Sequence, residues 1–303
     1  MIDPNLAPDL NTVKKIIEEL DSLDHKKATI EDLRIYINKI TTGYGVYAYY
    51  FNHGLVLFRG VLYPQKPTSF EHLIYPPLNK TKINRASDVG EQMFYSSTSR
   101  KAVLYELFAK PGDRLVISIW KTNNVLFFNN VGYTKANFEA LSSKRIPRDL
   151  PGVSIGNSPF VAEYLAKSFC QPISEENNDM YKMTIAIARV HLQNVIGNKF
   201  SGLFYPTVQM NAEDENFAII KETIDHGLLD LERVEFIEII DKKENRYQYK
   251  VIDVADGMRG NTIDWKNLNK SWTVYDDSDE LFIVKESGQF IAYNENGDIV
   301  DAD

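Results

Sequence analysis

The first forty residues carry apolar positions at helical spacing. This spacing predicts a helix over residues 11–23, capped by Asn11, with one apolar face formed by Val13, Ile16, Ile17, Leu20 and Leu23. Residues 29–40, "TIEDLRIYINKI", repeat the pattern, and Thr29 and Asp32 have the spacing of a capping box. We therefore expect an N-terminal pair of helices.

The pattern changes at Val46 to β-branched and aromatic runs. "VYAYYF" and "LVLFRGVLY" are joined by "NHG", whose glycine suits a positive φ, so they predict a β-hairpin. Arg59 is expected at the end of the second strand with its guanidinium in a cleft, and Gly60 beside it permits a close approach. Residues 64–91 are rich in proline and polar side chains, which is typical of a long loop.

The remaining chain alternates between strand and helix patterns. "QMFYSS" predicts a strand, and the helix that follows over "RKAVLYELFA" has Thr98 or Ser99 as its cap. After Asp241 short polar segments with the turn pairs Ser287-Gly288 and Asn296-Gly297 predict small hairpins. We therefore expect an α+β protein with a helical extension over 1–45, a mixed-sheet domain over 46–241 and a β-rich extension over 242–303.

Composition excludes several classes of function. The chain of 303 residues has a net charge of -8, which argues against binding a nucleic-acid backbone. No apolar run approaches the roughly 20 residues of a membrane span, and the first residues do not resemble a signal peptide, so we expect a cytoplasmic protein. The single cysteine, Cys170, rules out an intrachain disulfide and is interpreted as a small core residue.

The histidines offer no metal site, because none of the five form a pair at ligand spacing. Polar residues instead concentrate between Arg59 and Glu106. Guanidinium groups clamp phosphates and aromatic rings stack, while a carboxylate can stabilise an oxocarbenium-like transition state. This composition favours a phosphate-containing ligand with an aromatic ring.

Four short motifs, in this order, resemble the RES domain family, which is named for its arginine, glutamate and serine. They are "FRG" with Arg59, Asn84-Arg85 before a glycine-containing loop, "MFYSSTSRKAVLYE" with Tyr95 and Glu106, and "FSGLFYPT...NFAII". The resemblance runs from Leu55 to Ile220. It implies an ADP-ribosyltransferase-like fold and a toxin that consumes NAD as a substrate, without a metal or a bound cofactor. It also implies a helix-turn-helix antitoxin as a protein partner.

The resemblance assigns roles to particular residues. Glu106 would be the catalytic carboxylate, and Arg59 would act with it while holding NAD phosphate or ribose. Arg85 would clamp phosphate and Tyr95 would pack on nicotinamide or ribose. The family's serine falls on Thr207 in "YPT", a departure that keeps the hydroxyl and adds a methyl group.

Simpler interpretations compete with each role. Arg59 can be a solvated edge-strand residue, Tyr95 a core or rim residue, and Arg85 and Thr207 loop and turn residues. Glu106 can belong to a charged outer face of its helix. A rival mapping uses "STS" at 97–99 and "EDE" at 213–215, motifs of arginine-modifying ADP-ribosyltransferases, although "AEDEN" also suits an acidic surface loop. A third hypothesis is a catalytically inert module that binds NAD or a protein.

Overall fold

The fold is mixed α and β, as predicted, and its strands pair mostly antiparallel. The computed structural model describes residues 7–43, 49–133, 158–193, 200–210, 214–243, 246–269, 271–276, 282–286, 289–293 and 299–300. The chain forms two compact units. Unit 1 comprises Met1–Phe51, Pro76–Met93 and Leu126–Glu222, and unit 2 comprises Asn52–Tyr75, Phe94–Val125 and Thr223–Asp303. The predicted segment 46–241 therefore contributes to both units.

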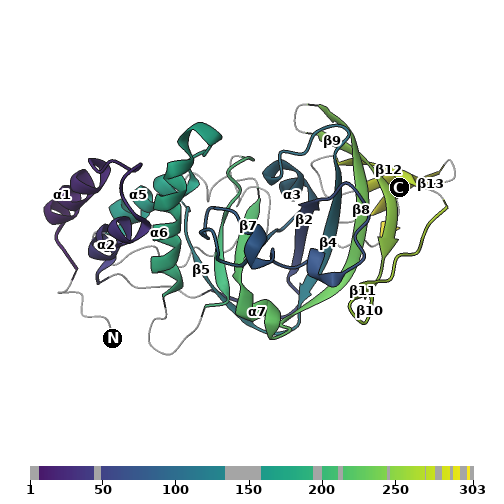
Figure 1. The fold of residues 1–303 in the computed structure, drawn as a ribbon, viewed down its shortest axis with the longest axis horizontal. Helices are drawn as coiled ribbons and strands as arrows, with labels where there is room; N and C mark the ends of the chain where they lie inside the picture. Colours follow the sequence, from purple (N-terminus) through teal and green to yellow (C-terminus); the bar gives the residue numbers. More distant parts are fainter. Residues whose placement is uncertain are drawn as a thin grey trace. The chain divides into compact units, whose positions relative to one another are not determined.

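Unit 1 combines helices with a short-stranded sheet. Its helices are α1 (Leu10–Asp21), α2 (Ile30–Thr41), η3 (Leu78–Lys80), α5 (Ser158–Cys170), η4 (Glu175–Met180) and α6 (Tyr181–Leu192). Its strands β1 (Tyr49–Phe51), β5 (Leu126–Asn130), β6 (Gly202–Pro206) and β7 (Glu215–Ile220) follow that order in the sheet, with β5 and β6 parallel. Figure 1 shows α1, α2, α5 and α6 grouped together, with α6 beside β5.

The predicted helix pair is confirmed, with one corrected cap. The α1 helix is capped by Asp9, which accepts from the backbone N–H groups of Asn11 and Thr12, so the expected cap at Asn11 is wrong. The capping box of α2 is present, because Thr29 and Asp32 exchange hydrogen bonds between side chain and backbone. The apolar faces of both helices are buried, and Lys182 of α6 ties down the turn between them by donating to the carbonyls of His25, Lys26 and Ala28.

Unit 2 is dominated by one antiparallel array of strands. In sheet order these are β3 (Met93–Ser97), β2 (Val56–Leu62), β4 (Arg114–Thr122), β8 (Leu229–Lys243), β9 (Arg246–Ala255), β12 (Trp272–Asp276), β13 (Phe282–Glu286), β14 (Gln289–Tyr293) and β15 (Ile299–Val300). The other elements are η2 (Phe70–His72), α3 (Arg100–Glu106), α7 (Lys221–Asp225, at a boundary of the units), β10 (Met258–Arg259) and β11 (Thr262–Ile263).

The first two strands form but do not make the predicted hairpin. β1 pairs with β5, whereas β2 pairs with β3 and β4, so that prediction is wrong. Gly54 between them has the expected positive φ, at 97°. The C-terminal hairpins are confirmed, since β13 pairs with β14 and β14 with β15. Their turn pairs Ser287-Gly288 and Asn296-Gly297 lie outside the described residues.

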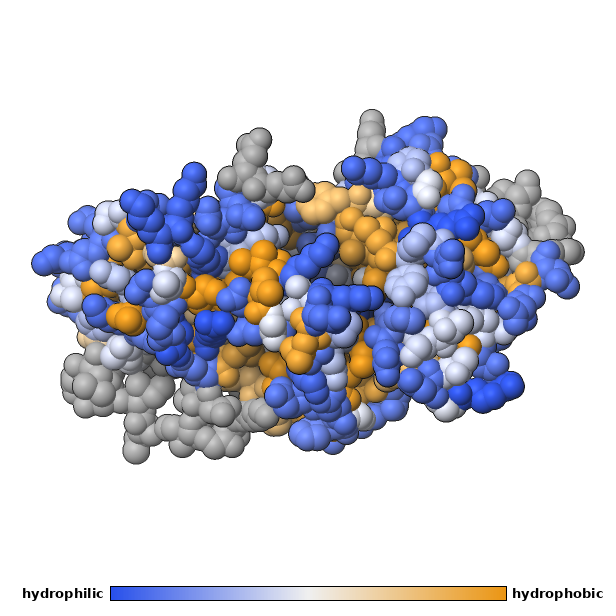
Figure 2. Space-filling model, in the orientation of Figure 1, coloured by the Kyte–Doolittle hydropathy of each residue, from blue (hydrophilic) through white to orange (hydrophobic). Residues whose placement is uncertain are grey.

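The core of unit 2 lies between α3 and the sheet. Phe58, Ile117, Ile237 and Tyr249 are buried there against Leu104 of α3. The face of the molecule in Figure 2 is mainly hydrophilic, with separate hydrophobic patches. In the part of the chain that the structure describes, no helix is both long and apolar enough to cross a bilayer.

Candidate functional site

Arg59 lies in the middle of β2 and is buried, with 9% of its surface exposed. Its Nε donates to the carbonyl oxygens of Leu73 and Ile74, both at 3.1 Å, and its Nη1 donates to the carbonyl oxygen of Tyr95 at 2.9 Å. The guanidinium carbon lies 5.1 Å from the centre of the Phe94 ring. The expectation of a strand-end residue is therefore wrong, and so is the solvated-edge interpretation.

The charge of Arg59 has no acidic counterpart among the described residues. Its hydrogen-bond acceptors there are backbone carbonyls, and Nη2 makes no hydrogen bond to that part of the chain. Burial lowers the pKa of Arg59 to about 10, and the interaction with Tyr95 offsets only part of this effect. A buried cation of this kind attracts an anion strongly.

A second polar group lies on the Arg59 side of the sheet. Phe58 pairs with Ser97 across β2 and β3, and the Arg59 guanidinium lies over Phe94, so the alternation along β3 places Ser96 on the Arg59 side of the sheet. The Ser96 Oγ is buried and has no hydrogen-bond partner among the described residues. Arg59 and Ser96 together leave hydrogen-bonding capacity unused on this face, which is what an anionic ligand requires.

The two faces of β2 serve different purposes. Side chains alternate along a strand, so Arg59 points away from the face that holds Phe58 and Gly60. A Cβ at Gly60 would lie 2.2 Å from Val103 Cγ1 and 2.8 Å from Leu107 Cδ1, which shows that α3 packs directly on Gly60. The close approach expected at Gly60 is confirmed, and it is made by α3. The guanidinium of Arg59 therefore lies on the face opposite to α3.

Glu106 is half-buried at the last residue of α3. Leu104 of the same helix is buried in the core of unit 2, and residues two apart on a helix project from opposite sides. Glu106 therefore projects from the side of α3 away from Leu104, and it is half-buried there. By alternation along β3, the Tyr95 side chain projects from the face opposite to Phe94, over whose ring the Arg59 guanidinium lies.

The start of α3 is anchored by an ion pair that sequence reasoning missed. Ser99 caps the helix, as predicted. Arg100 binds Glu235 of β8 through two hydrogen bonds, Nη2 to Oε1 at 2.9 Å and Nε to Oε2 at 3.1 Å. Burial pushes the pKa of Glu235 up, but Arg100 and Arg233 together hold it below its ordinary value. Arg100 and Lys101 are buried, so the interpretation that they form a charged outer face of this helix is wrong.

Arg85 lies in unit 1 and binds the end of α5. Its Nη1 donates to the carbonyl oxygens of Phe169 and Gln171, and its guanidinium carbon lies 5.9 Å from the Phe169 ring. Carbonyls at a helix C-terminus lack partners within the helix, and a cation there is stabilised by the helix dipole. The backbone contacts give Arg85 a structural role. Cys170 is the last residue of α5 but is only half-buried, so it is not the core residue that its sequence interpretation predicts.

Thr207 and Glu215 lie at the β6–β7 turn of unit 1. The backbone N–H of Thr207 donates to the Asp214 carbonyl at 2.8 Å, and the Asp214 N–H donates to Thr207 Oγ1 at 3.1 Å. Glu215 is buried and accepts from the Tyr133 hydroxyl at 2.8 Å. The interpretation of Asp214 and Glu215 as an acidic surface loop is therefore wrong, while Glu213 lies outside the described residues.

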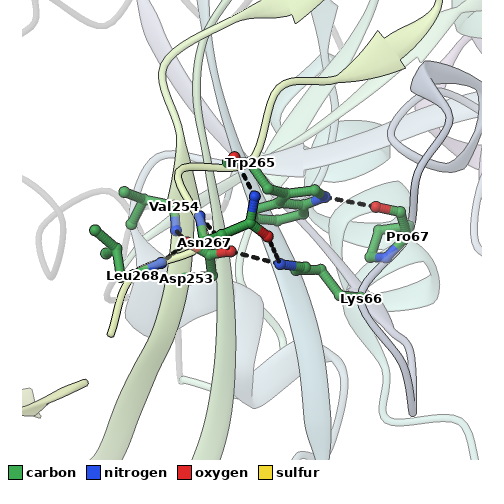
Figure 3. Close-up of polar contacts among 7 residues, drawn as sticks. All are labelled: Lys66, Pro67, Asp253, Val254, Trp265, Asn267 and Leu268. Atoms are coloured by element: carbon green, nitrogen blue, oxygen red, sulfur yellow. Dashed lines mark hydrogen bonds and ion pairs between the residues drawn. The ribbon is translucent and has the colours of Figure 1, made fainter. Parts of the chain in front are cut away.

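Sequence reasoning also did not predict a second buried carboxylate in unit 2, that of Asp253. Figure 3 shows Lys66 and Asn267 directed at Asp253 of β9. Lys66 Nζ lies 2.6 Å from Asp253 Oδ2 and 2.9 Å from Asn267 Oδ1, and the indole N–H of Trp265 donates to the Pro67 carbonyl at 2.6 Å. These contacts fasten two loops to β9. Among the described residues, no group of three or more His, Cys, Asp or Glu side chains is arranged to hold a metal ion.

Comparisons of the chain with protein-family models, curated proteins and solved structures found no match.

Proposed function

We propose that the protein consumes NAD by breaking the bond between nicotinamide and ribose, with Glu106 as the catalytic carboxylate. The observation that supports this proposal is the position of Glu106, half-buried at the last residue of α3, a helix that packs on the sheet beside β2. A carboxylate at the edge of a packed helix remains reachable and is held in a defined position. Tyr95 supplies an aromatic ring for nicotinamide or ribose.

The reaction requires little from the protein beyond charge and position. The C1′–N bond breaks, and its electron pair leaves with nicotinamide, which becomes neutral. Positive charge then develops on the ribose, and the Glu106 carboxylate stabilises it. A water or phosphate oxygen forms the new bond to C1′, and a water nucleophile releases its proton to solvent. The sum is hydrolysis or phosphorolysis, with no net oxidation.

Arg59 has a different position in this proposal from Glu106. Its hydrogen bond to the Tyr95 carbonyl fixes β3 beneath the tyrosine ring, and its unmatched charge raises the potential around the strand. Arg85 and Thr207 remain predicted NAD ligands in unit 1. The family resemblance extends the proposal to an ADP-ribosyltransferase-like fold, a cytoplasmic toxin and a helix-turn-helix antitoxin.

Nicotinamide release from NAD tests the proposal. The purified chain is incubated with NAD in water or phosphate buffer, and nicotinamide is followed by chromatography. Glu106→Gln is expected to lower kcat by about 100-fold or more with an unchanged melting temperature. Glu238→Gln is the matched control, because Glu238 lies in the same unit and its ion pair with Arg114 is partly exposed. Turnover that survives Glu106→Gln but disappears in Glu215→Gln would instead favour protein ADP-ribosylation by the rival mapping.

A second candidate function is the binding of an anionic ligand without turnover. The position of Arg59 and Ser96 favours it, since both have unused hydrogen-bonding capacity on the face opposite to Glu106. Calorimetric titration with NAD distinguishes the two candidates. The binding module predicts NAD binding that Arg59→Met abolishes, with no nicotinamide released by the unmodified protein.

A further inference from the structure

The turn that follows Glu106 has a bulky residue where glycine is usual. Phe108 has a φ of 50°, in the left-handed region. The N–H of Phe108 donates to the Tyr105 carbonyl at 3.0 Å and that of Ala109 to the Leu104 carbonyl at 3.1 Å, which is the Schellman arrangement at a helix end. A side chain in this conformation strains the backbone, and the Phe108 ring is 57% exposed, so its burial offsets little of that strain.

Tyr247 of β9 holds this turn from outside the helix. Its hydroxyl lies 3.3 Å from the Leu104 carbonyl oxygen and 3.2 Å from the Ala109 carbonyl oxygen, so one proton is shared between two acceptors on either side of Phe108. Tyr247 is 1% exposed, and its ring centre lies 5.2 Å from that of Tyr105 in an edge-to-face arrangement. The hydroxyl therefore restrains both ends of the strained turn.

The other end of α3 is fixed by the Arg100–Glu235 pair. The helix has only seven residues, too few to be stable alone, so its position depends on these anchors. Glu106 lies between the core of the helix and the turn that Tyr247 restrains. Any freedom at that turn moves the Glu106 carboxylate directly.

We propose that Tyr247 is a positioning residue for Glu106. This inference rests on the proposed function, because Glu106 must be the reacting carboxylate. Tyr247 contacts the backbone around the turn, and its hydroxyl prevents the strained residues from relaxing to another conformation. Catalysis by a charged group depends on its placement relative to the reacting bond, so loosening the turn lowers the rate more than it weakens substrate binding.

Tyr247→Phe tests this role, because it removes the hydroxyl and keeps the ring. We expect kcat for nicotinamide release to fall by about tenfold while KM for NAD stays within about twofold. Adding Phe108→Gly relieves the strain without the hydroxyl, so the double variant is expected to recover most of the lost kcat. Trp265→Phe is the matched control: it removes one buried aromatic hydrogen bond in the same unit, to Pro67, and is expected to leave kcat unchanged.

Hydrogen exchange provides a readout that does not require activity. The amides of Phe108 and Ala109 are expected to exchange faster in Tyr247→Phe than in the unmodified chain, and to be unaffected in Trp265→Phe. Unchanged exchange in Tyr247→Phe, an unchanged kcat, or an equal loss of kcat in Trp265→Phe would each overturn the inference. Failure of the proposed function has a separate signature, since the unmodified chain would then release no nicotinamide, or Glu106→Gln would retain full turnover, while the exchange result for Tyr247→Phe still stood.

Discussion

Two buried arginines, Arg59 of β2 and Arg100 of α3, lie on opposite faces of β2 and differ in their charged partners. Arg100 lies over Phe58, 4.9 Å from its ring, and pairs with the Glu235 carboxylate through two hydrogen bonds. Arg59 lies over Phe94, 5.1 Å from its ring, and in the described part of the chain it donates hydrogen bonds to backbone carbonyls and none to a carboxylate. Both are less than a tenth exposed. They share the aromatic platform and the burial, and they differ in the presence of an acid.

This difference gives the two charges different roles: the Arg100 charge stabilises the fold, and the Arg59 charge is available to an anionic ligand. The Arg100 charge is neutralised inside the protein, so removing one partner leaves the other buried and alone. The Arg59 charge is solvated by carbonyl dipoles, which stabilise it without cancelling it. An anionic ligand therefore gains more from Arg59, while the fold gains more from Arg100. The variants below test that division.

Arg100→Met should have the largest effect on stability. It leaves Glu235 buried with only Arg233, whose Nε lies 3.2 Å from Glu235 Oε1 and whose side chain is 38% exposed. We expect a loss of about 3 kcal/mol or more in the free energy of unfolding, measured by urea denaturation. Arg114→Met is the matched control, because its pair with Glu238 joins β4 to the same strand β8, is partly exposed and should contribute under about 1 kcal/mol. Equal losses of unfolding free energy in the two variants would contradict a structural role for the Arg100–Glu235 pair.

Gly60→Ala should have the second-largest effect on stability, and it should disturb only the packing of α3 on β2. The new methyl group would meet Val103 Cγ1 and Leu107 Cδ1 well inside van der Waals contact. We expect a destabilisation of about 1–3 kcal/mol from overpacking, measured by thermal unfolding. Adding Val103→Ala makes room and should recover part of the loss. A single variant as stable as the original would show that α3 does not press on β2 at this position.

The local elements could be predicted from the sequence because their signals lie within a few residues. The capping box at Thr29 and Asp32, the cap at Ser99 and the strand around Arg59 all depend on neighbouring side chains. The pairing of β1 could not be predicted, because its partner β5 lies 75 residues away and only the folded sheet joins them. Strand propensity identifies a strand but carries little information about its partner.

The arrangement of the candidate site was even harder to predict from the sequence than the pairing of β1. The sequence motifs predict site roles for Arg59, Tyr95 and Glu106, but the face of the sheet on which Arg59 and Tyr95 project depends on strand register. Glu235 and Asp253 gave no signal, since their partners Arg100 and Lys66 are more than 130 residues distant in the chain. A charged residue in a strand of alternating polarity is ordinary on a solvated face. Only the fold reveals that these carboxylates are buried and paired.

Arg59→Met should change stability less than Arg100→Met and ligand binding more. The lowered pKa of Arg59 corresponds to a destabilisation of about 3 kcal/mol from keeping its charge buried, and methionine removes that destabilisation. Against this gain, the carbonyls of Leu73, Ile74 and Tyr95 lose their donor, at about 1–3 kcal/mol for each one that water cannot reach. Because the two terms oppose each other, we expect a smaller loss in the free energy of unfolding than in Arg100→Met, measured by urea denaturation.

The same variant should lose affinity for NAD in calorimetry, because the unmatched charge is gone. Arg100→Met, examined under conditions where it remains folded, should retain more of that affinity. If Arg59→Met instead unfolds the protein and Arg100→Met loses the ligand, the two arginines have been assigned the wrong way round.

The smallest effect should be a difference in acid sensitivity. Burial raises the pKa of Glu235, but Arg100 and Arg233 lower it further than burial raises it, so in the folded protein it lies below its ordinary value of 4.5. The unfolded chain then binds more protons, and the stability from Glu235 is complete above pH 4.5 and is lost as the pH falls through the lowered value. Urea midpoints measured from pH 6 down to pH 3 should therefore fall less steeply in Arg100→Met than in the unmodified chain. Arg59 has no carboxylate partner among the described residues, so Arg59→Met should keep the original slope, and a flattened slope there would reveal an acid paired with Arg59.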